Sequence, residues 1–225
     1  MSMGEQVASV WFRESRPARE APLTRSRIVA EAVALLDAEG ADRLTMRRLA
    51  GRLGSGATTL YWHVDTKDDV LDLALDAVFA EVDLAPGAAG WRGELMRLLT
   101  DWRAMLLRHP WSAVLLGRRP LMGPNALACT EYLHALLVDA GLRAPELMAS
   151  AYALSNYVIG CATNQVGWRT QDEPAVRRAA HEHLRGNAER YPTLAAHMDV
   201  LDADWDSSFR RGLEYLLDGI TARLG

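Results

Sequence analysis

The chain has 225 residues, of which 49% are hydrophobic, and it carries a formal net charge of −4 at pH 7. This composition excludes a disordered chain, and no apolar run reaches the roughly 18 residues of a transmembrane helix. Cys129 and Cys161 lack metal-type spacing and are expected to be core residues, and no signal peptide is visible, so we expect a cytoplasmic protein.

Hydrophobic residues recur at helical spacing along the whole chain, and no alternating run is typical of a strand, so we predict an all-α fold. The first helix is expected to begin after Thr24, as its N-cap, and to end at Gly40. The second is expected to begin after Thr45 and to end at Gly54. A tight glycine turn and a short helix follow, and Thr66 with Asp69 resembles a capping box. Further boundaries give a short helix over 57–63, helices near 67–84, 92–108, 123–140, 145–168, 174–187 and 205–223, and loops over 170–174 and 191–204.

A helix, a glycine turn and a short second helix are typical of a helix-turn-helix, whose second helix enters the DNA major groove. From Arg43 to His63 the chain has four arginines and no acid, so the local charge suits DNA although the whole chain is acidic. Leu60 should face inward, while the threonines of the short helix can contact base edges or phosphates. The candidate DNA-binding residues are Thr45, Arg47, Arg48, Thr58, Thr59, Tyr61, Trp62, His63 and Lys67.

Residues 23–82 resemble the N-terminal domain of the TetR family of transcriptional regulators, and within it the tetracycline repressor subclass. The resemblance rests on LTMRRLAGRLG at 44–54 and TLYWHV at 59–64, followed by Lys67. It implies that Arg47, Thr59, Tyr61, His63 and Lys67 contact DNA and that Trp62 lies on the recognition helix. Ala57 and Thr58 stand where the subclass has glutamine and proline, so the operator sequence should differ. We therefore divide the chain into an arm (1–22), a helix-turn-helix domain (23–70) and a ligand-binding and dimerisation domain (71–225).

The C-terminal region is rich in large apolar side chains, most of which are expected to form ordinary core. The resemblance implies that some of them line a pocket for a small, largely apolar or aromatic effector. The candidate ligand-binding residues are Trp102, Met105, Leu115, Met122, Tyr132, Asn156, Asn164 and Trp168.

The subclass binds magnesium–tetracycline through a histidine and a glutamate, where this chain has Leu115 and Asn164. Leucine cannot ligate magnesium, so we predict that the chain does not sense this chelate. His181 and His183 lie two residues apart on a predicted helix and point to different faces, so they are not expected to chelate a metal. We expect no metal site and no cofactor.

One recognition helix reads only a few base pairs, so we expect a homodimer on a palindrome. The resemblance implies a four-helix bundle between protomers, formed by the small-residue helix at 145–168 and the last helix. The last helix has an apolar face of Phe209, Leu213, Leu216, Leu217 and Ile220.

The expected function is therefore a ligand-responsive regulator, a repressor by family frequency, that releases DNA when its effector binds. An enzyme with an appended DNA-binding domain stays an alternative, although no phosphate loop, GxSxG or HExxH motif is present, and we expect no enzyme. A structural DNA-binding protein is a second alternative, but it would be more basic.

The N-terminal arm contains Arg13, Arg16 and Arg19, which follow Trp11 and Phe12. It is either a segment that contacts the DNA minor groove or a disordered tail.

Overall fold

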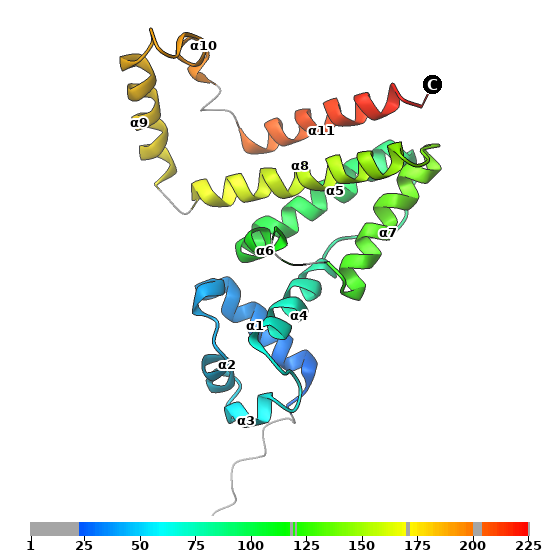
Figure 1. The fold of residues 1–225 in the computed structure, drawn as a ribbon, viewed down its shortest axis with the longest axis vertical. Coiled ribbons are helices and arrows are strands. Elements are labelled where there is room, and N and C mark those ends of the chain that lie inside the picture. The colour runs from blue at the N-terminus through cyan, green and yellow to red at the C-terminus, as the bar shows by residue number, and fades with distance from the viewer. Residues whose placement is uncertain (1–22, 118, 120, 170–171, 200–203, 225) are drawn as a thin grey trace, which may run out of the picture.

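A computed structural model describes residues 23–117, 119, 121–169, 172–199 and 204–224. The expected all-α class is confirmed, because these residues form helices and no strand (Figure 1). The N-terminal part contains α1 (Arg25–Glu39), the 3₁₀ turn η2 (Ala41–Arg43), α2 (Met46–Arg52), α3 (Ala57–Leu60) and α4 (Lys67–Phe79). The C-terminal part contains α5 (Gly90–Arg108), α6 (Pro110–Leu116), α7 (Pro124–Asp139), α8 (Glu146–Arg169), α9 (Glu173–Gly186), α10 (Pro192–Ala196) and α11 (Trp205–Thr221). The expected arm, with Trp11, Phe12 and its three arginines, lies outside the described residues.

The three threonine caps are confirmed. The side chains of Thr24, Thr45 and Thr66 each accept a hydrogen bond from a backbone N–H in the first turn of α1, α2 and α4. Thr66 and Asp69 form a full capping box. The Asp69 carboxylate accepts hydrogen bonds, chiefly from the Thr66 backbone N–H, and these hold the pKa of Asp69 below its usual range. These caps satisfy N–H groups that have no partner inside the helix, which is why the helices begin at these residues.

Several predicted boundaries were wrong. Helix α4 ends at Phe79 rather than near residue 84, and 3₁₀-type hydrogen bonds continue from Ala80 to Val82. The short helices α6 and α10 were missed, and α10 lies inside the predicted loop 191–204. Both have a proline in the first turn, where the missing N–H costs nothing. Helix α9 begins at Glu173, one residue before the predicted start at 174, with Pro174 in its first turn and Asp172 as its N-cap.

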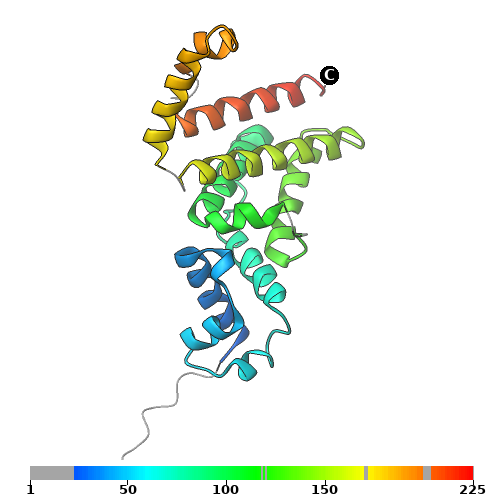
Figure 2. The same ribbon diagram turned by 60° about the vertical axis from the view of Figure 1, so that its left-hand side comes forward.

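Helices α5 and α8 pack together at the centre of the C-terminal part, with α7 and α6 on one side and α11 on the other (Figures 1 and 2). Helix α4 joins the two parts, because it packs on α1 below and on α7 and α5 above. Helices α9 and α10 project from the body. The start of α9 is anchored by Arg177, which pairs with Glu173 at 2.6 Å and lies over the rings of Trp168 and Trp205.

Candidate functional site

The second and third helices form the predicted helix-turn-helix. Gly54 has φ +63°, a conformation that favours glycine, and it turns the chain between α2 and α3. Helix α3 ends at Leu60, but hydrogen bonds from the backbone N–H groups of His63 and Val64 to the Leu60 carbonyl, at 2.9 and 3.1 Å, continue a helical path. Leu60 is fully buried, as expected, and lies in the same core as Leu49 and Leu53.

Thr58, Thr59, Tyr61 and Trp62 are all exposed on this short segment. Trp62 has 84% of its surface open to solvent, the largest exposure recorded for a large hydrophobic residue of the described chain. Tyr61 beside it is 50% exposed, so two large aromatic side chains lie open to solvent on this segment. His63 is half-buried beside this surface.

Three of the remaining predicted DNA contacts, Thr45, Arg48 and Lys67, have partners within the chain. Thr45 caps α2 through the Arg48 backbone N–H, and the Arg48 side chain pairs with Glu39 of α1. Lys67 is half-buried and donates to the carbonyl oxygen of Ala41 at 3.4 Å. Arg47 is exposed. The acidic partner of Arg48 was not foreseen, since Glu39 lies nine residues away on another helix.

The candidate effector residues are spread over α5, α6, α7, α8 and the segment before α7. Trp102, Met105 and Leu115 are buried. Tyr132 and Trp168 are half-buried, whereas Met122, Asn156 and Asn164 are exposed. Trp102 shows one chemical feature that the sequence did not reveal: its indole Nε1–H is buried and has no hydrogen-bond acceptor among the described residues. Its ring lies edge-on to Phe79 of α4, with 5.7 Å between centroids.

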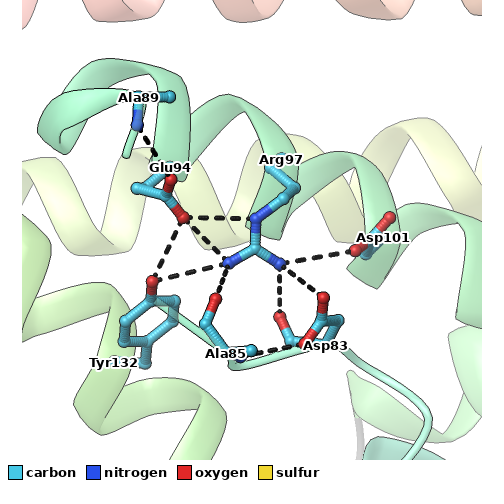
Figure 3. A network of polar contacts seen from close by, with 7 residues as sticks. All are labelled: Asp83, Ala85, Ala89, Glu94, Arg97, Asp101 and Tyr132. Atoms are coloured by element: carbon cyan, nitrogen blue, oxygen red, sulfur yellow. Dashed lines mark hydrogen bonds and ion pairs between the residues drawn. The ribbon is translucent and has the colours of Figure 1, made fainter. Parts of the chain in front are cut away.

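Tyr132 belongs to a polar network at the end of α4 (Figure 3). Arg97 donates to the carbonyl oxygens of Asp83 and Ala85 at 2.8 and 2.7 Å and to the Glu94 carboxylate at 2.9 Å. The Tyr132 hydroxyl donates to the same carboxylate at 3.2 Å. Hydrogen bonding from Arg97 outweighs burial and lowers the pKa of Glu94. The network holds the segment after α4 against α5 and α7.

A second polar cluster joins the two parts of the molecule around His109, between α5 and α6. Its Nδ1 lies 2.7 Å from Asp37 of α1, and its Nε2 lies 2.8 Å from Glu81, just after α4. Trp111 donates to the same Asp37 oxygen at 2.7 Å. Burial raises the pKa of Glu81, but the hydrogen bonds from His109 and Arg108 outweigh it and the net shift is downward. The His109 ring therefore links α1 to the segment after α4 through one carboxylate on each.

Helix α4 is held by the C-terminal part at two further points. Arg119 pairs with Asp72 at 2.6 Å and also with Asp68. Asp76 accepts from the backbone N–H groups of Asn125 and Ala126, each at 3.0 Å, and so caps α7 from another helix. Sequence reasoning missed these contacts because each joins residues about fifty positions apart, with no local pattern to reveal it.

Two negative findings apply to the described residues. They contain no group of three or more histidines, cysteines, aspartates or glutamates that could hold a metal ion. Within the same residues, no helix is both long and apolar enough to cross a membrane.

Comparisons with known proteins agree over both parts of the chain. Residues 28–74 match the family "Bacterial regulatory proteins, tetR family", and residues 85–224 match "Tetracyclin repressor-like, C-terminal domain". An HTH-type transcriptional regulator of Saccharopolyspora erythraea is 48% identical over 219 residues, which cover 96% of this chain and 93% of the relative. The HTH-type transcriptional repressor DrrR1 of Streptomyces coeruleorubidus is 34% identical, with 94% and 83% covered.

Among solved structures, the TetR family protein ActR of Streptomyces coelicolor, in complex with actinorhodin, superimposes with a TM-score of 0.82. It is 34% identical, and the match covers 91% of this chain and 100% of ActR. The relatives are named as transcriptional regulators and not as enzymes. With the helix-turn-helix at one end and a large helical body at the other, the chain belongs to the TetR family of transcriptional regulators.

Proposed function

We propose that this protein represses transcription by binding a palindromic operator as a homodimer in the cytoplasm, and that a small, largely apolar or aromatic effector releases it without any catalytic step. The observation that supports DNA binding is the exposure of Thr58, Thr59, Tyr61 and Trp62 on the second helical segment of a helix-turn-helix. The similarity to DrrR1, which is named a repressor, supports the direction of control.

The operator contacts are assigned by exposure and chemistry. Thr58 and Thr59, early in α3, are placed to reach base edges, while Tyr61, Trp62 and His63 follow toward the phosphates. Arg47 is exposed on α2 and free to approach the backbone. Arg48 must exchange Glu39 for a phosphate when DNA binds, so we expect it to contribute less affinity than Arg47.

A dimer is supported by the outer face of α8 and α11. A groove of about 450 Å³ between these helices is lined by small residues of α8 and by Tyr215 and Gly219 of α11. Tyr152 and Tyr215 are 74% and 67% exposed. Of the face that was expected to form the dimer, Leu216 and Ile220 line this groove, whereas Phe209, Leu213 and Leu217 are buried within the protomer. The groove and the exposed tyrosines beside it are therefore the proposed interface.

The effector half of the proposal rests on Trp102. Its buried indole N–H has no acceptor among the described residues, and a ligand could supply one. Its ring also packs against Phe79, which lies on α4. ActR, in a similar fold, was solved with actinorhodin bound. A ligand that favours one position of α4 shifts the spacing of the two recognition helices, which must be about 34–36 Å to fit successive major grooves.

The experiment that tests the proposal is selection of bound duplexes from a random DNA pool. We expect the parent protein to enrich a palindrome and the double variant Thr59→Ala/Tyr61→Ala to enrich none, because one recognition contact is worth about 1–3 kcal/mol. Leu194→Ala, an exposed position on α10, serves as the matched control and should enrich the same palindrome. Thermal unfolding establishes that every variant is folded. If the parent enriches nothing, or the double variant enriches the same palindrome, the proposed operator binding is wrong.

A further inference from the structure

Helices α5, α8 and α11 meet at a pocket of about 410 Å³ that is separate from the residues assigned above to DNA and to the effector. Arginines dominate its lining: Arg103 and Arg108 from α5, Arg169 from α8 and Arg210 from α11. Asp206 is the one acidic residue among the lining residues, so the pocket has a clear excess of positive charge. Leu107 and Phe209 add an apolar wall.

Arg103 makes this pocket chemically unusual. The residue is only 6% exposed, and its guanidinium lies over the ring of Phe209, 4.7 Å from the centroid. Its Nη1 donates to Asp206 at 2.8 Å and its Nη2 to the amide oxygen of Gln165 at 2.6 Å. Its Nε is buried without an acceptor among the residues that the structure describes. A buried charged donor without a partner is costly, so the site lacks an acceptor.

From these features we infer that the α5–α8–α11 pocket binds an organic acid, with its carboxylate among the arginines and its apolar body against Leu107 and Phe209. Guanidinium groups suit this ligand, because they bind carboxylates in a bidentate way and stack on planar rings. The exposed arginines at the rim, Arg169 and Arg210, can close on the carboxylate without disturbing the core.

The pocket also touches the polar cluster around His109 through one residue, Arg108. Arg108 lines the pocket, and its guanidinium pairs with Glu81 at 2.8 Å. The other oxygen of Glu81 faces His109, which in turn contacts Asp37 of α1. A carboxylate in the pocket competes with Glu81 for Arg108, so its binding favours a different set of contacts between the two parts of the molecule. This consequence rests on the proposed function, whereas binding of the acid itself does not.

The experiment is calorimetric titration of the full-length protein, without DNA, with 2-naphthoate and with its neutral counterpart 2-naphthamide. We expect saturable binding of naphthoate and about tenfold weaker binding of the amide, since a charge-assisted contact is lost. Arg210→Gln and Arg169→Gln should each weaken naphthoate binding about tenfold. Arg211→Gln removes the same charge from the neighbouring exposed position of α11, which does not line the pocket, and should leave binding unchanged.

Three results would each overturn the inference. They are the absence of saturable naphthoate binding, equal affinity for the amide, and equal affinity in the Arg210 and Arg169 variants. The last result would place naphthoate elsewhere, such as beside Trp102. Because both rim arginines are exposed, thermal unfolding should show folded variants. Since no DNA is present, a negative result leaves operator binding intact, and a failed operator selection leaves this result intact.

Discussion

At the scale of single residues, the least expected feature is His109, whose two ring nitrogens face carboxylates from α1 and from the end of α4. The sequence alone assigned no role to this histidine. Its role depends on Asp37 and Glu81, which are 72 and 28 residues away. Because its two ring nitrogens lie within hydrogen-bond distance of carboxylates on two other elements, His109 acts as a tie between α1 and the segment after α4.

The tie can be measured by replacing His109 with glutamine, whose single amide group cannot reach both carboxylates at once. We expect His109→Gln to lower the free energy of unfolding by about 2 kcal/mol, less than for a fully buried pair, because both carboxylates reach solvent. Urea unfolding at pH 7 is the measurement. His134→Gln is the control, since within the described residues the hydrogen bond of His134 is to the Thr130 carbonyl of its own helix. Equal stability of the two variants would show that His109 is not a tie.

At the scale of helices, α4 has polar contacts at its start, along one face and just beyond its end. Thr66 and Asp69 cap its start, Arg119 and the α7 N-terminus contact its acidic face, and the Arg97 network holds the segment after it. A helix held at both ends and along one face moves as a rigid unit, which suits a lever between effector and DNA.

The Arg97 network makes a pH prediction. The folded-state pKa of Glu94 lies below its ordinary value of 4.5, so between these two values the unfolded chain binds more protons. The stability that Glu94 contributes is therefore complete above pH 4.5 and is lost as the pH falls through the folded-state pKa. Glu94→Gln should be less stable than the parent at pH 7, and the difference should shrink at pH 3.5. Urea unfolding at both values tests this, and a constant difference would contradict it.

At the scale of the whole molecule, the exposed aromatic face of α8 and α11 determines the expected assembly. The same face carries the groove of small residues, which lets helices of a second copy approach closely. The two exposed tyrosines, Tyr152 and Tyr215, are therefore the side chains that we expect a second copy to cover.

Replacing Tyr215 with glutamate should convert the dimer to a monomer, because a charge would be buried without a partner at a symmetric interface. Sedimentation velocity measures the change directly. The matched control is Leu194→Glu on α10, which places the same charge at an exposed apolar position outside the groove. A dimer that survives Tyr215→Glu would place the interface elsewhere.

Ligand choice is also a property of the whole fold. Leu115 is buried and offers no ligand atom to magnesium, and Asn164 is exposed. We therefore expect magnesium–tetracycline to leave the operator complex intact at concentrations that saturate a tetracycline repressor tested in parallel. Fluorescence anisotropy of labelled operator DNA is the measurement, and release by tetracycline would refute the expectation.

The sequence by itself determined the all-α class, the three threonine caps, the helix-turn-helix and the family, because periodicity, caps and a contiguous motif are local features. It also indicated which side of the recognition segment is buried, since Leu60 was expected to face inward and the threonines before it to face DNA. The sequence did not reveal α6 and α10, because these short helices, each with a proline in its first turn, contain too few residues to show a helical period.

Only the tertiary structure decided how the two parts are joined and where ligands can lie. The contacts of His109, the cap that Asp76 gives α7, and the arginine pocket each combine residues from helices far apart in the chain. It also decided that the apolar face of α11 packs inside the protomer, leaving Tyr215 outside. Periodicity shows that a helix has an apolar face but not which neighbour covers it, because that choice depends on packing among all the helices at once.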